Sequence, residues 1–348
     1  MIKYLGSKRT LIPTICQLVN RLPNVRSTID LFSGTSRVGH AFKERGYQVL
    51  SNDHNSYAAT LARCYVQSNL EDVVTEVQKH IAEFNQLTGE AGYFTENFCE
   101  KALFFQPRNG ARVDAIREKI ETKDLSEEVK AVLLVSLMEA ADRVDSTTGV
   151  QMAYLKKWAP RAYNDLTLRV PNLLSEPANG KCKAHQMDAL QAAETLTADL
   201  AYLDPPYNQH KYIGNYHIWE TLVLWDKPEV YGVARKRVDV RERKSEFNSK
   251  KTAVEQFSKV IEALDARYLM VSFSDEGYIS RENMERILQK RGEVLVIEKD
   301  YKRYVGAQIG VHSPKGIKVG EVSHLRNKEY IYIVSPNGDD LQGLTGDE

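Results

Sequence analysis

The chain has 348 residues, 42% hydrophobic and 27% charged, an ordinary globular composition that suits one large α/β domain with an insertion or two domains. Its 47 basic and 47 acidic residues cancel, so composition alone does not indicate a nucleic-acid partner, and any basic surface must be local. Four scattered cysteines argue against structural zinc and a disulfide framework and fit a reducing cytoplasm, and no signal-peptide pattern or long apolar stretch predicts a membrane partner.

The chain starts with a basic segment, KYLGSKR at residues 3–9, before a helix predicted over residues 10–21. Basic residues around a Gly-Ser turn at a helix start can hold a carboxylate, because backbone N–H groups and positive charge converge there. A basic N-terminus that is simply solvated is the alternative, and this segment alone does not decide between the two.

An apolar run predicts a strand over residues 28–32, which is followed by a tight SGTS turn and a helix that ends at Gly46. A second strand, over residues 47–50, precedes Asp53. Gly34 in the turn would let the backbone approach a ligand closely, and a carboxylate after the second strand can accept from both hydroxyls of a ribose. The turn lacks GxGxxG and a P-loop lysine, so triphosphate binding is not favoured. A plain βαβ unit with a surface aspartate is the alternative.

Helical periodicity extends over residues 57–144 and includes a largely buried helix near its end. The following segment, residues 149–169, mixes basic side chains with aromatic rings and contains Lys156, Lys157 and Trp158. Such a mixture can follow a phosphate backbone and stack on bases, which predicts DNA contacts for the two lysines. A loop packed on the domain by its rings explains the pattern equally well.

A short strand is predicted over residues 181–184, and Asp188 follows it. Ligands of open α/β sheets bind at the carboxyl ends of strands, which makes Asp188 a candidate ligand contact. Asp188 also precedes an apolar helical segment, where aspartate is a common N-cap. The two roles are compatible.

The strand predicted over residues 200–203 ends in Asp204, Pro205, Pro206 and Tyr207. Two consecutive prolines cannot continue a central strand, because each lacks the N–H that the ladder needs. They fix an extended backbone with exposed carbonyls between a carboxylate and an aromatic ring. This arrangement suits a planar group with an exocyclic amine, held by the acceptors and stacked on the ring. A strand-terminating turn without further function is the alternative.

Two later segments concentrate positive charge: residues 235–251 hold eight Lys or Arg against three acids, and residues 301–328 hold six against one. A DNA-binding face in a neutral protein requires such local charge. A solvated charge run is the alternative for the first segment. The predicted DNA-binding residues in these segments are Arg235, Lys236, Arg237, Arg241, Arg243, Lys302 and Arg303.

The remaining elements of the second half alternate between helix and strand. We predict a helix over residues 216–225 and strands over residues 267–273, 293–298 and 329–335. The Gly- and Asp-rich tail, residues 336–348, is predicted to be disordered.

Taken in order, these elements resemble the DNA adenine-N6 methyltransferases of the Dam-like group, in which the cofactor motifs precede the catalytic one. KYLGSK at residues 3–8 is similar to the N-terminal segment of that group, DLFSG at 30–34 to its main S-adenosylmethionine motif, and DPPY at 204–207 to its catalytic motif. VSFS at 271–274 and KEYI at 328–331 resemble its late strands. The helical stretch followed by TTGVQMAYLKKW is similar to a branch that includes modification enzymes of restriction systems.

The resemblance implies an α/β fold with a Rossmann-like methyltransferase sheet, a helical insertion and basic DNA-contacting loops. Residues 1–56 and 176–335 would form the catalytic domain, and residues 57–175 the helical insertion, which could carry part of the DNA recognition. The implied activity is site-specific methylation of N6 of a flipped-out adenine in double-stranded DNA by S-adenosylmethionine. The implied setting is a cytoplasmic enzyme, a monomer or weak dimer without a metal, that can accompany a cognate restriction endonuclease.

The resemblance also assigns the methionine end of the cofactor site. Tyr4 would stack near the cofactor, and Lys8 would meet its carboxylate. Asp30 begins the main cofactor motif, in which Gly34 and the backbone of Phe32 would lie against the methionine portion.

At the other end of the cofactor, the resemblance implies that Asp53 holds the ribose hydroxyls and Asp188 the adenine amine. Asp204 and the Pro205 carbonyl would accept the two N6 hydrogens of the target adenine, and Tyr207 would stack on it. Pro206 completes the catalytic motif.

Three other functions share parts of this pattern. Cytosine-N4 DNA methyltransferases usually have Ser, and RNA or glutamine-amide methyltransferases Asn, where this chain has Asp204. The covalent cytosine-carbon route uses a Pro-Cys pair, which the chain lacks. A non-catalytic DNA-binding or specificity subunit on the same fold is the remaining alternative, and intact Asp204, Asp53 and Gly34 argue against such decay.

Overall fold

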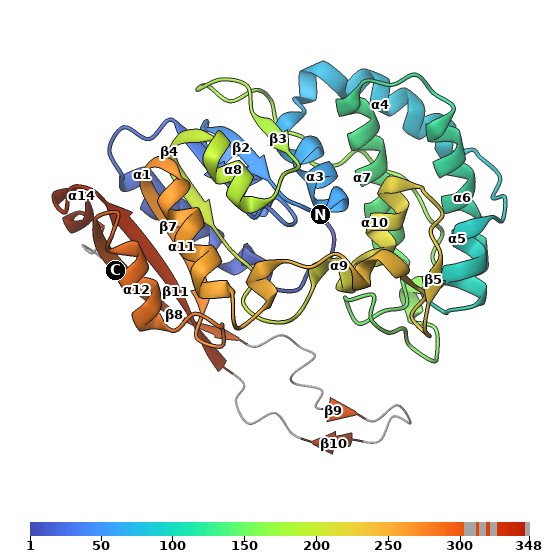
Figure 1. Ribbon diagram of the computed structural model, residues 1–348. Coiled ribbons are helices and arrows are strands. Elements are labelled where there is room, and N and C mark those ends of the chain that lie inside the picture. Colours follow the sequence, from blue (N-terminus) through green and yellow to red (C-terminus); the bar gives the residue numbers. More distant parts are fainter. Residues whose placement is uncertain (303–310, 313–317, 321–325, 345–348) are drawn as a thin grey trace.

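The computed structural model describes residues 1–302, 311–312, 318–320 and 326–344, and its centre is a seven-stranded sheet of order β3-β2-β1-β4-β7-β11-β8 (Figure 1). Strands β3, β2, β1, β4 and β7 are parallel, and β11 runs antiparallel between β7 and β8. The bounds are β1 Ser27–Asp30, β2 Gln48–Asn52, β3 Lys183–His185, β4 Thr197–Leu203, β7 Asp265–Ser274, β8 Glu293–Lys302 and β11 Arg326–Ser335. The predicted α/β class and its strands are confirmed.

Helices cover both faces of the sheet, as the apolar strands require. One face packs against α1 (Ile12–Arg21), α2 (Arg37–Glu44) and α14 (Asp339–Gln342), and the other against α8 (Ala189–Thr195), α11 (Ala253–Ala263) and α12 (Arg281–Leu288). In β4, Leu200 and Tyr202 point to the first face and Ala201 and Leu203 to the second. A strand buried on both faces reads as an uninterrupted apolar run, which explains the sequence before Asp204.

The long helical segment forms a second cluster with its own core, to the right of the sheet in Figure 1. Its elements are α3 (Ser56–Ala62), the π-helix η2 (Arg63–Gln67), α4 (Leu70–Asn85), α5 (Tyr93–Thr95), the π-helix η3 (Glu96–Glu100), α6 (Pro107–Glu121) and α7 (Glu127–Arg143). Helix α10 (His217–Leu224) joins this cluster through the buried side chains of Trp219 and Leu222. The helical cluster therefore extends beyond residues 57–175, because the apolar side of α10 faces α3 and α7 rather than the sheet.

The remaining elements are short. They are η1 (Lys8–Thr10), η4 (Pro160–Tyr163), α9 (Tyr212–Asn215), the β5–β6 hairpin (Val230–Tyr231 and Lys236–Arg237), η5 (Val238–Arg241), η6 (Glu246–Asn248) and the β9–β10 pair (Val311–His312 and Lys318–Gly320). Within the described ranges, we find no helix with the length and apolarity needed to cross a bilayer.

The end of the chain corrects one prediction. Residues 336–344 are not a disordered tail: they form a turn and the short helix α14, and Leu341 and Leu344 are buried against the sheet. Two leucines among polar residues, spaced three apart on one side of a helical turn, supply this contact. The high Gly and Asp content of the segment predicted disorder, because it outweighed the signal of these two leucines.

Candidate active site

A large pocket lies where the parallel strands end, as expected for an open α/β sheet. It holds about 1220 Å³, counting the part open to solvent, and is lined by residues that follow β1, β2, β3 and β4. Nine of the predicted cofactor and catalytic residues line this one pocket: Tyr4, Lys8, Asp30, Phe32, Gly34, Asp53, Asp188, Asp204 and Pro206. The structure therefore brings together side chains that lie up to 200 positions apart in the sequence.

The turn after β1 is built around Gly34 and bonded to Asp53. Gly34 has φ +50°, and a Cβ there would lie 3.4 Å from the Tyr4 ring, so both the backbone angle and the close approach favour glycine. The Gly34 N–H donates to Asp53 Oδ2 at 3.0 Å, and the Asn55 N–H donates to Oδ1 at 2.9 Å. Burial raises the pKa of Asp53, and these two N–H groups oppose the rise.

Asp30 plays a structural part beneath this turn. Its side chain is buried and accepts from the Gly39 N–H at 3.0 Å, which ties the end of β1 to the start of α2. Burial raises the pKa of Asp30 to about 7, against the opposing Gly39 hydrogen bond.

Two further predicted cofactor residues lie on either side of the pocket. The Tyr4 ring stacks on Tyr216 with centroids 4.5 Å apart and on Tyr212 at 5.3 Å, and its hydroxyl lies 3.0 Å from that of Tyr57. Asp188 accepts from the Leu190 N–H at 2.9 Å, which confirms its N-cap role at α8. Its exposed side chain also faces the pocket that Tyr4 lines.

The DPPY segment, residues 204–207, takes part in a largely buried polar group of four side chains. Lys8 Nζ lies 3.1 Å from Asp204 Oδ1 and 2.5 Å from Glu329 Oε1, and it also donates to the Tyr207 hydroxyl. That hydroxyl lies 2.9 Å from Asp204 Oδ1 and 2.5 Å from Glu329 Oε1. The Tyr207 ring contacts Phe273 edge-on at 4.8 Å. Lys8, predicted to meet the cofactor carboxylate, thus lies at the catalytic end of the pocket.

Burial and neighbouring charges act in opposite directions on these groups. Burial raises the pKa of Asp204 to about 6, the Lys8 ammonium opposes this rise, and the Glu329 charge adds to it. Burial alone would lower the pKa of Lys8, but Asp204 and Glu329 raise it above its usual value. Lys8 is therefore charged, and Asp204 ionises near neutral pH.

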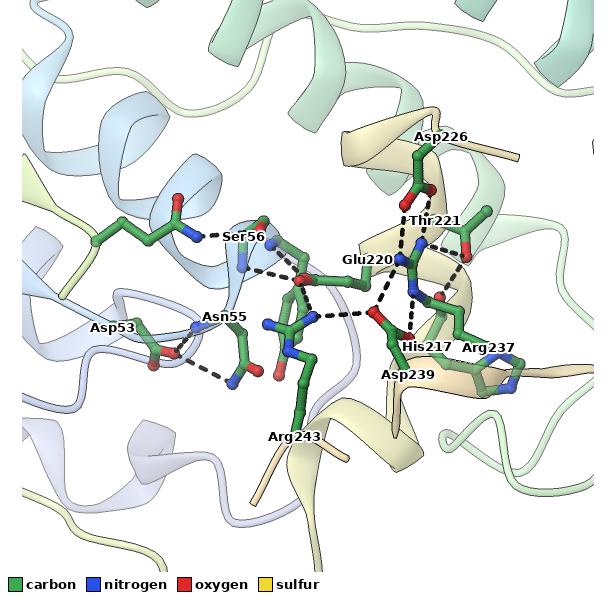
Figure 2. Close-up of polar contacts among 12 residues, drawn as sticks. Asp53, Asn55, Ser56, His217, Glu220, Thr221, Asp226, Arg237, Asp239 and Arg243 are labelled. Carbon is green, nitrogen blue, oxygen red and sulfur yellow. Dashed lines mark hydrogen bonds and ion pairs between the residues drawn. The ribbon is translucent and has the colours of Figure 1, made fainter. Parts of the chain in front are cut away.

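Two predicted DNA-binding arginines are instead paired inside the protein (Figure 2). Arg237 is 3% exposed and donates to Asp226 through two bonds of 2.7 Å and to Asp239 through two bonds of 3.0 Å. A DNA contact is therefore wrong for Arg237. Arg243 donates at 2.7 Å to the fully buried Glu220, whose charge it compensates.

Glu220 also links Arg243 to the start of α3. Its carboxylate accepts from the N–H groups of Ser56 at 3.2 Å and Tyr57 at 2.9 Å, three and four residues after Asp53 (Figure 2). Arg243 itself lines the pocket. The segment with the high count of basic residues thus contributes to the wall of the pocket as well as to the surface.

The other basic residues differ in exposure. Lys156, Lys157 and Arg241 are exposed, and the Arg241 guanidinium lies 3.8 Å from the centroid of the Tyr231 ring. Arg235 and Lys236 are half-buried, and Arg235 donates to Asn97. The Lys302 side chain and Arg303 lie outside the described residues.

Glu329 is the functional candidate that the sequence analysis missed. Glu329, Ile331 and Ile333 share one face of β11, and the two isoleucines are buried against α1 and α2. An acid in line with a buried apolar face is a recognisable signal, since charged residues are rarely buried without a partner. In the described part of the chain, no group of three or more His, Cys, Asp or Glu side chains could hold a metal ion.

Comparison with known families gives a match over most of the chain. The model of the D12 class N6 adenine-specific DNA methyltransferases matches residues 4–287. Among individual proteins, the chain is 34% identical to the type II methyltransferase M.FokI of Planomicrobium okeanokoites over 311 residues, 84% of this chain and 47% of that protein.

Two further relatives extend the comparison. The chain is 28% identical to the type II methyltransferase M.NlaIII of Neisseria lactamica, over 94% of this chain and 100% of that protein. It is 28% identical to the modification methylase StsI of Streptococcus sanguinis, over 87% of this chain and 49% of that protein. The chain thus spans about half the length of M.FokI and StsI and the whole length of M.NlaIII.

Proposed function

Because the chain belongs to the D12 class of N6 adenine-specific DNA methyltransferases, we propose that it transfers a methyl group from S-adenosylmethionine to N6 of adenine at a specific site in double-stranded DNA. One observation carries the proposal: a single pocket joins the turn at Gly34 and Asp53 to the carboxylate of Asp204. A nucleoside site and an amine acceptor therefore share one cavity, as transfer between two bound molecules requires.

The nucleoside end of the pocket fits S-adenosylmethionine. Asp53 has its two oxygens fixed by backbone N–H groups and remains partly exposed to the pocket, where it can accept from ribose hydroxyls. Gly34 provides a backbone surface without a side chain, and the Tyr4 ring stands beside it. Asp188 can accept from an adenine amine. When bound, the sulfonium cofactor supplies an electrophilic methyl group.

The residues at the catalytic end act on the nucleophile. The N6 lone pair of adenine is delocalised into the ring, and acceptors on its two N–H bonds draw it out of conjugation. Asp204 and the Pro205 carbonyl would supply these acceptors, and Tyr207 would stack on the base. Asp204 can take up the proton that the amine releases as it is alkylated. Because N6 is hidden in a duplex, the base must leave the stack first.

We also propose how the protein contacts DNA, which partner it has and which oligomeric state it adopts. The exposed Lys156, Lys157 and Arg241 would contact the phosphate backbone, since exposed cations that neutralise phosphates give salt-dependent affinity. The names of the relatives describe a type II methyltransferase and a modification methylase, which supports a cognate restriction endonuclease as a genetic partner. We propose a monomer or weak dimer as the active form.

Methyl transfer to plasmid DNA tests the proposal directly. The full chain is incubated with tritiated S-adenosylmethionine and plasmid from a methylation-free host, and the DNA is digested to nucleosides. We expect label in N6-methyladenine and none with Asp204→Ala. Label in N4-methylcytosine would establish the cytosine alternative, and DNA binding without any label would establish a non-catalytic DNA-binding protein. Long-read sequencing of the product then gives the recognition site.

A further inference from the structure

Glu329 is a buried acid that the reaction described above does not use. Its side chain is 6% exposed and lies on β11, in register with Ser274 of β7. Its Oε1 is 2.5 Å from Lys8 Nζ and 2.5 Å from the Tyr207 hydroxyl. Glu329 therefore contacts the same two donors that contact the catalytic carboxylate.

The two donors meet Asp204 at one atom. Lys8 Nζ at 3.1 Å and the Tyr207 hydroxyl at 2.9 Å both approach Asp204 Oδ1. The amine of a target adenine needs an acceptor at this carboxylate, so it competes with both donors. Lys8 is 7% exposed, and a buried ammonium that loses an acceptor without gaining another is strongly penalised.

We propose that Glu329 is a positioning residue for methyl transfer, which retains Lys8 and Tyr207 as their second acceptor while Asp204 turns to the adenine amine. This inference rests on the proposed function. The Tyr207 hydroxyl has one proton and two acceptors, so its bond can pass from Asp204 to Glu329 without loss. Lys8 has three protons and stays paired with Glu329. Asp204 is thereby released to the amine while every buried donor remains bonded.

The position of the two acids in the sheet supports a shared task. Asp204 continues the face of β4 that carries Leu200 and Tyr202, and Glu329 continues the face of β11 that carries Ile331 and Ile333. Both faces are covered by α1, and Lys8 lies in η1 just before that helix. One ammonium therefore lies between two carboxylates from different strands.

Charged and titratable groups from every neighbouring element face this group. Lys8 comes from η1, Asp204 and Tyr207 from the end of β4, and Glu329 from β11. Tyr202, Asp30 and Tyr212 lie further around Asp204, and the charge of Asp204 contributes to the raised pKa of each. Among these groups only Glu329 can accept from both Lys8 and Tyr207 when Asp204 does not.

The test compares Glu329→Gln with a matched control, Glu298→Gln. Glu298 lies on the adjacent strand β8, pairs with Lys328 and is 40% exposed. The assay is single-turnover transfer of tritiated methyl groups to plasmid DNA from a methylation-free host, at pH values from 5 to 9. The melting temperature and the affinity for S-adenosylhomocysteine are measured in parallel.

We expect Glu329→Gln to slow transfer by roughly 10- to 100-fold at pH 8. Without the Glu329 carboxylate, Lys8 keeps its ion pair with Asp204, and Asp204 is then less free to accept from the adenine amine. We also expect the acid limb of the pH profile to move down by about one pH unit, since the variant removes a negative charge beside Asp204. Cofactor affinity should stay unchanged, and Glu298→Gln should match the wild type throughout.

Two results would overturn the inference. One is wild-type transfer by Glu329→Gln at every pH. The other is a loss of transfer rate that is the same at every pH and is accompanied by a fall in melting temperature, which would indicate that Glu329 has a structural role alone. If Glu329→Gln fails to fold, Glu329→Asp is tested in its place. Because this variant keeps the carboxylate, we expect it to transfer methyl groups at part of the wild-type rate, with the acid limb of the pH profile unchanged. Absence of transfer by the wild type would refute the proposed function instead, so the two failures are distinguishable.

Discussion

Replacing the catalytic carboxylate should make the protein more stable while it abolishes transfer. In the folded chain Asp204 is 21% exposed and its pKa is about 6, against an ordinary value of 3.8. Burial is the main cause, and the ionised carboxylate therefore carries an unfavourable free energy in the fold. Asp204→Asn keeps the shape and removes the charge, and Lys8 retains Glu329 as its partner.

The magnitude follows from the two pKa values. A group whose pKa is raised on folding stabilises the fold when protonated, and this contribution is lost as the pH rises from 3.8 to about 6. At about 1.4 kcal/mol per pH unit, the ionised form costs at most about 3 kcal/mol at pH 8 and about 1.6 kcal/mol at pH 5. At pH 8, Asp204→Asn should therefore have a higher free energy of unfolding than the wild type. This advantage of the variant over the wild type should be about 1.4 kcal/mol larger at pH 8 than at pH 5.

Urea unfolding of both proteins at pH 5 and pH 8 provides the measurement. Differences between variant and wild type cancel the titration of buried acids that are not coupled to Asp204, such as Asp142. A variant that is no more stable than the wild type at pH 8 would refute the reasoning. An equal difference at both pH values would refute it as well, because the effect must come from ionisation.

Three further predictions concern cofactor, core and DNA. Asp53→Ala should weaken binding of S-adenosylhomocysteine by roughly 10- to 100-fold in calorimetry and leave DNA affinity unchanged, since it removes two charge-assisted ribose contacts. Arg237→Met should lower the free energy of unfolding by about 1–3 kcal/mol in urea, because it removes the hydrogen bonds of a buried guanidinium while Asp226 and Asp239, 42% and 36% exposed, can still be hydrated. Changing both Lys156 and Lys157 to Ala should reduce the slope of log affinity against log salt by roughly 1–2 and leave urea unfolding unaltered; an unchanged slope would exclude phosphate contacts at these lysines.

Much of the sheet and the pocket could be predicted, because their signals are local. Apolar runs mark buried strands, and the polar residues that end them, such as Asp53 and Asp204, meet at one edge of a parallel sheet by geometry alone. Partners from distant segments could not be predicted. Nothing near Lys8 in the sequence indicates that it lies against Glu329, 321 positions away. The packing of α10 on α3 and α7 depends in the same way on tertiary contacts.

The basic segment, residues 235–251, shows why a charge count overestimates a DNA-binding face. Acids outside the segment neutralise part of its positive charge, since Arg237 pairs with Asp226 and Arg243 with Glu220. Pairs of this kind position the backbone: Glu220 accepts from N–H groups at the start of α3, which follows the turn at Asp53 that we propose holds the ribose. Exposed Arg241 remains for solvent or phosphate. The proposed DNA-binding surface is therefore smaller than the charge count of residues 235–251 predicts, which gives the test of Lys156 and Lys157 more weight.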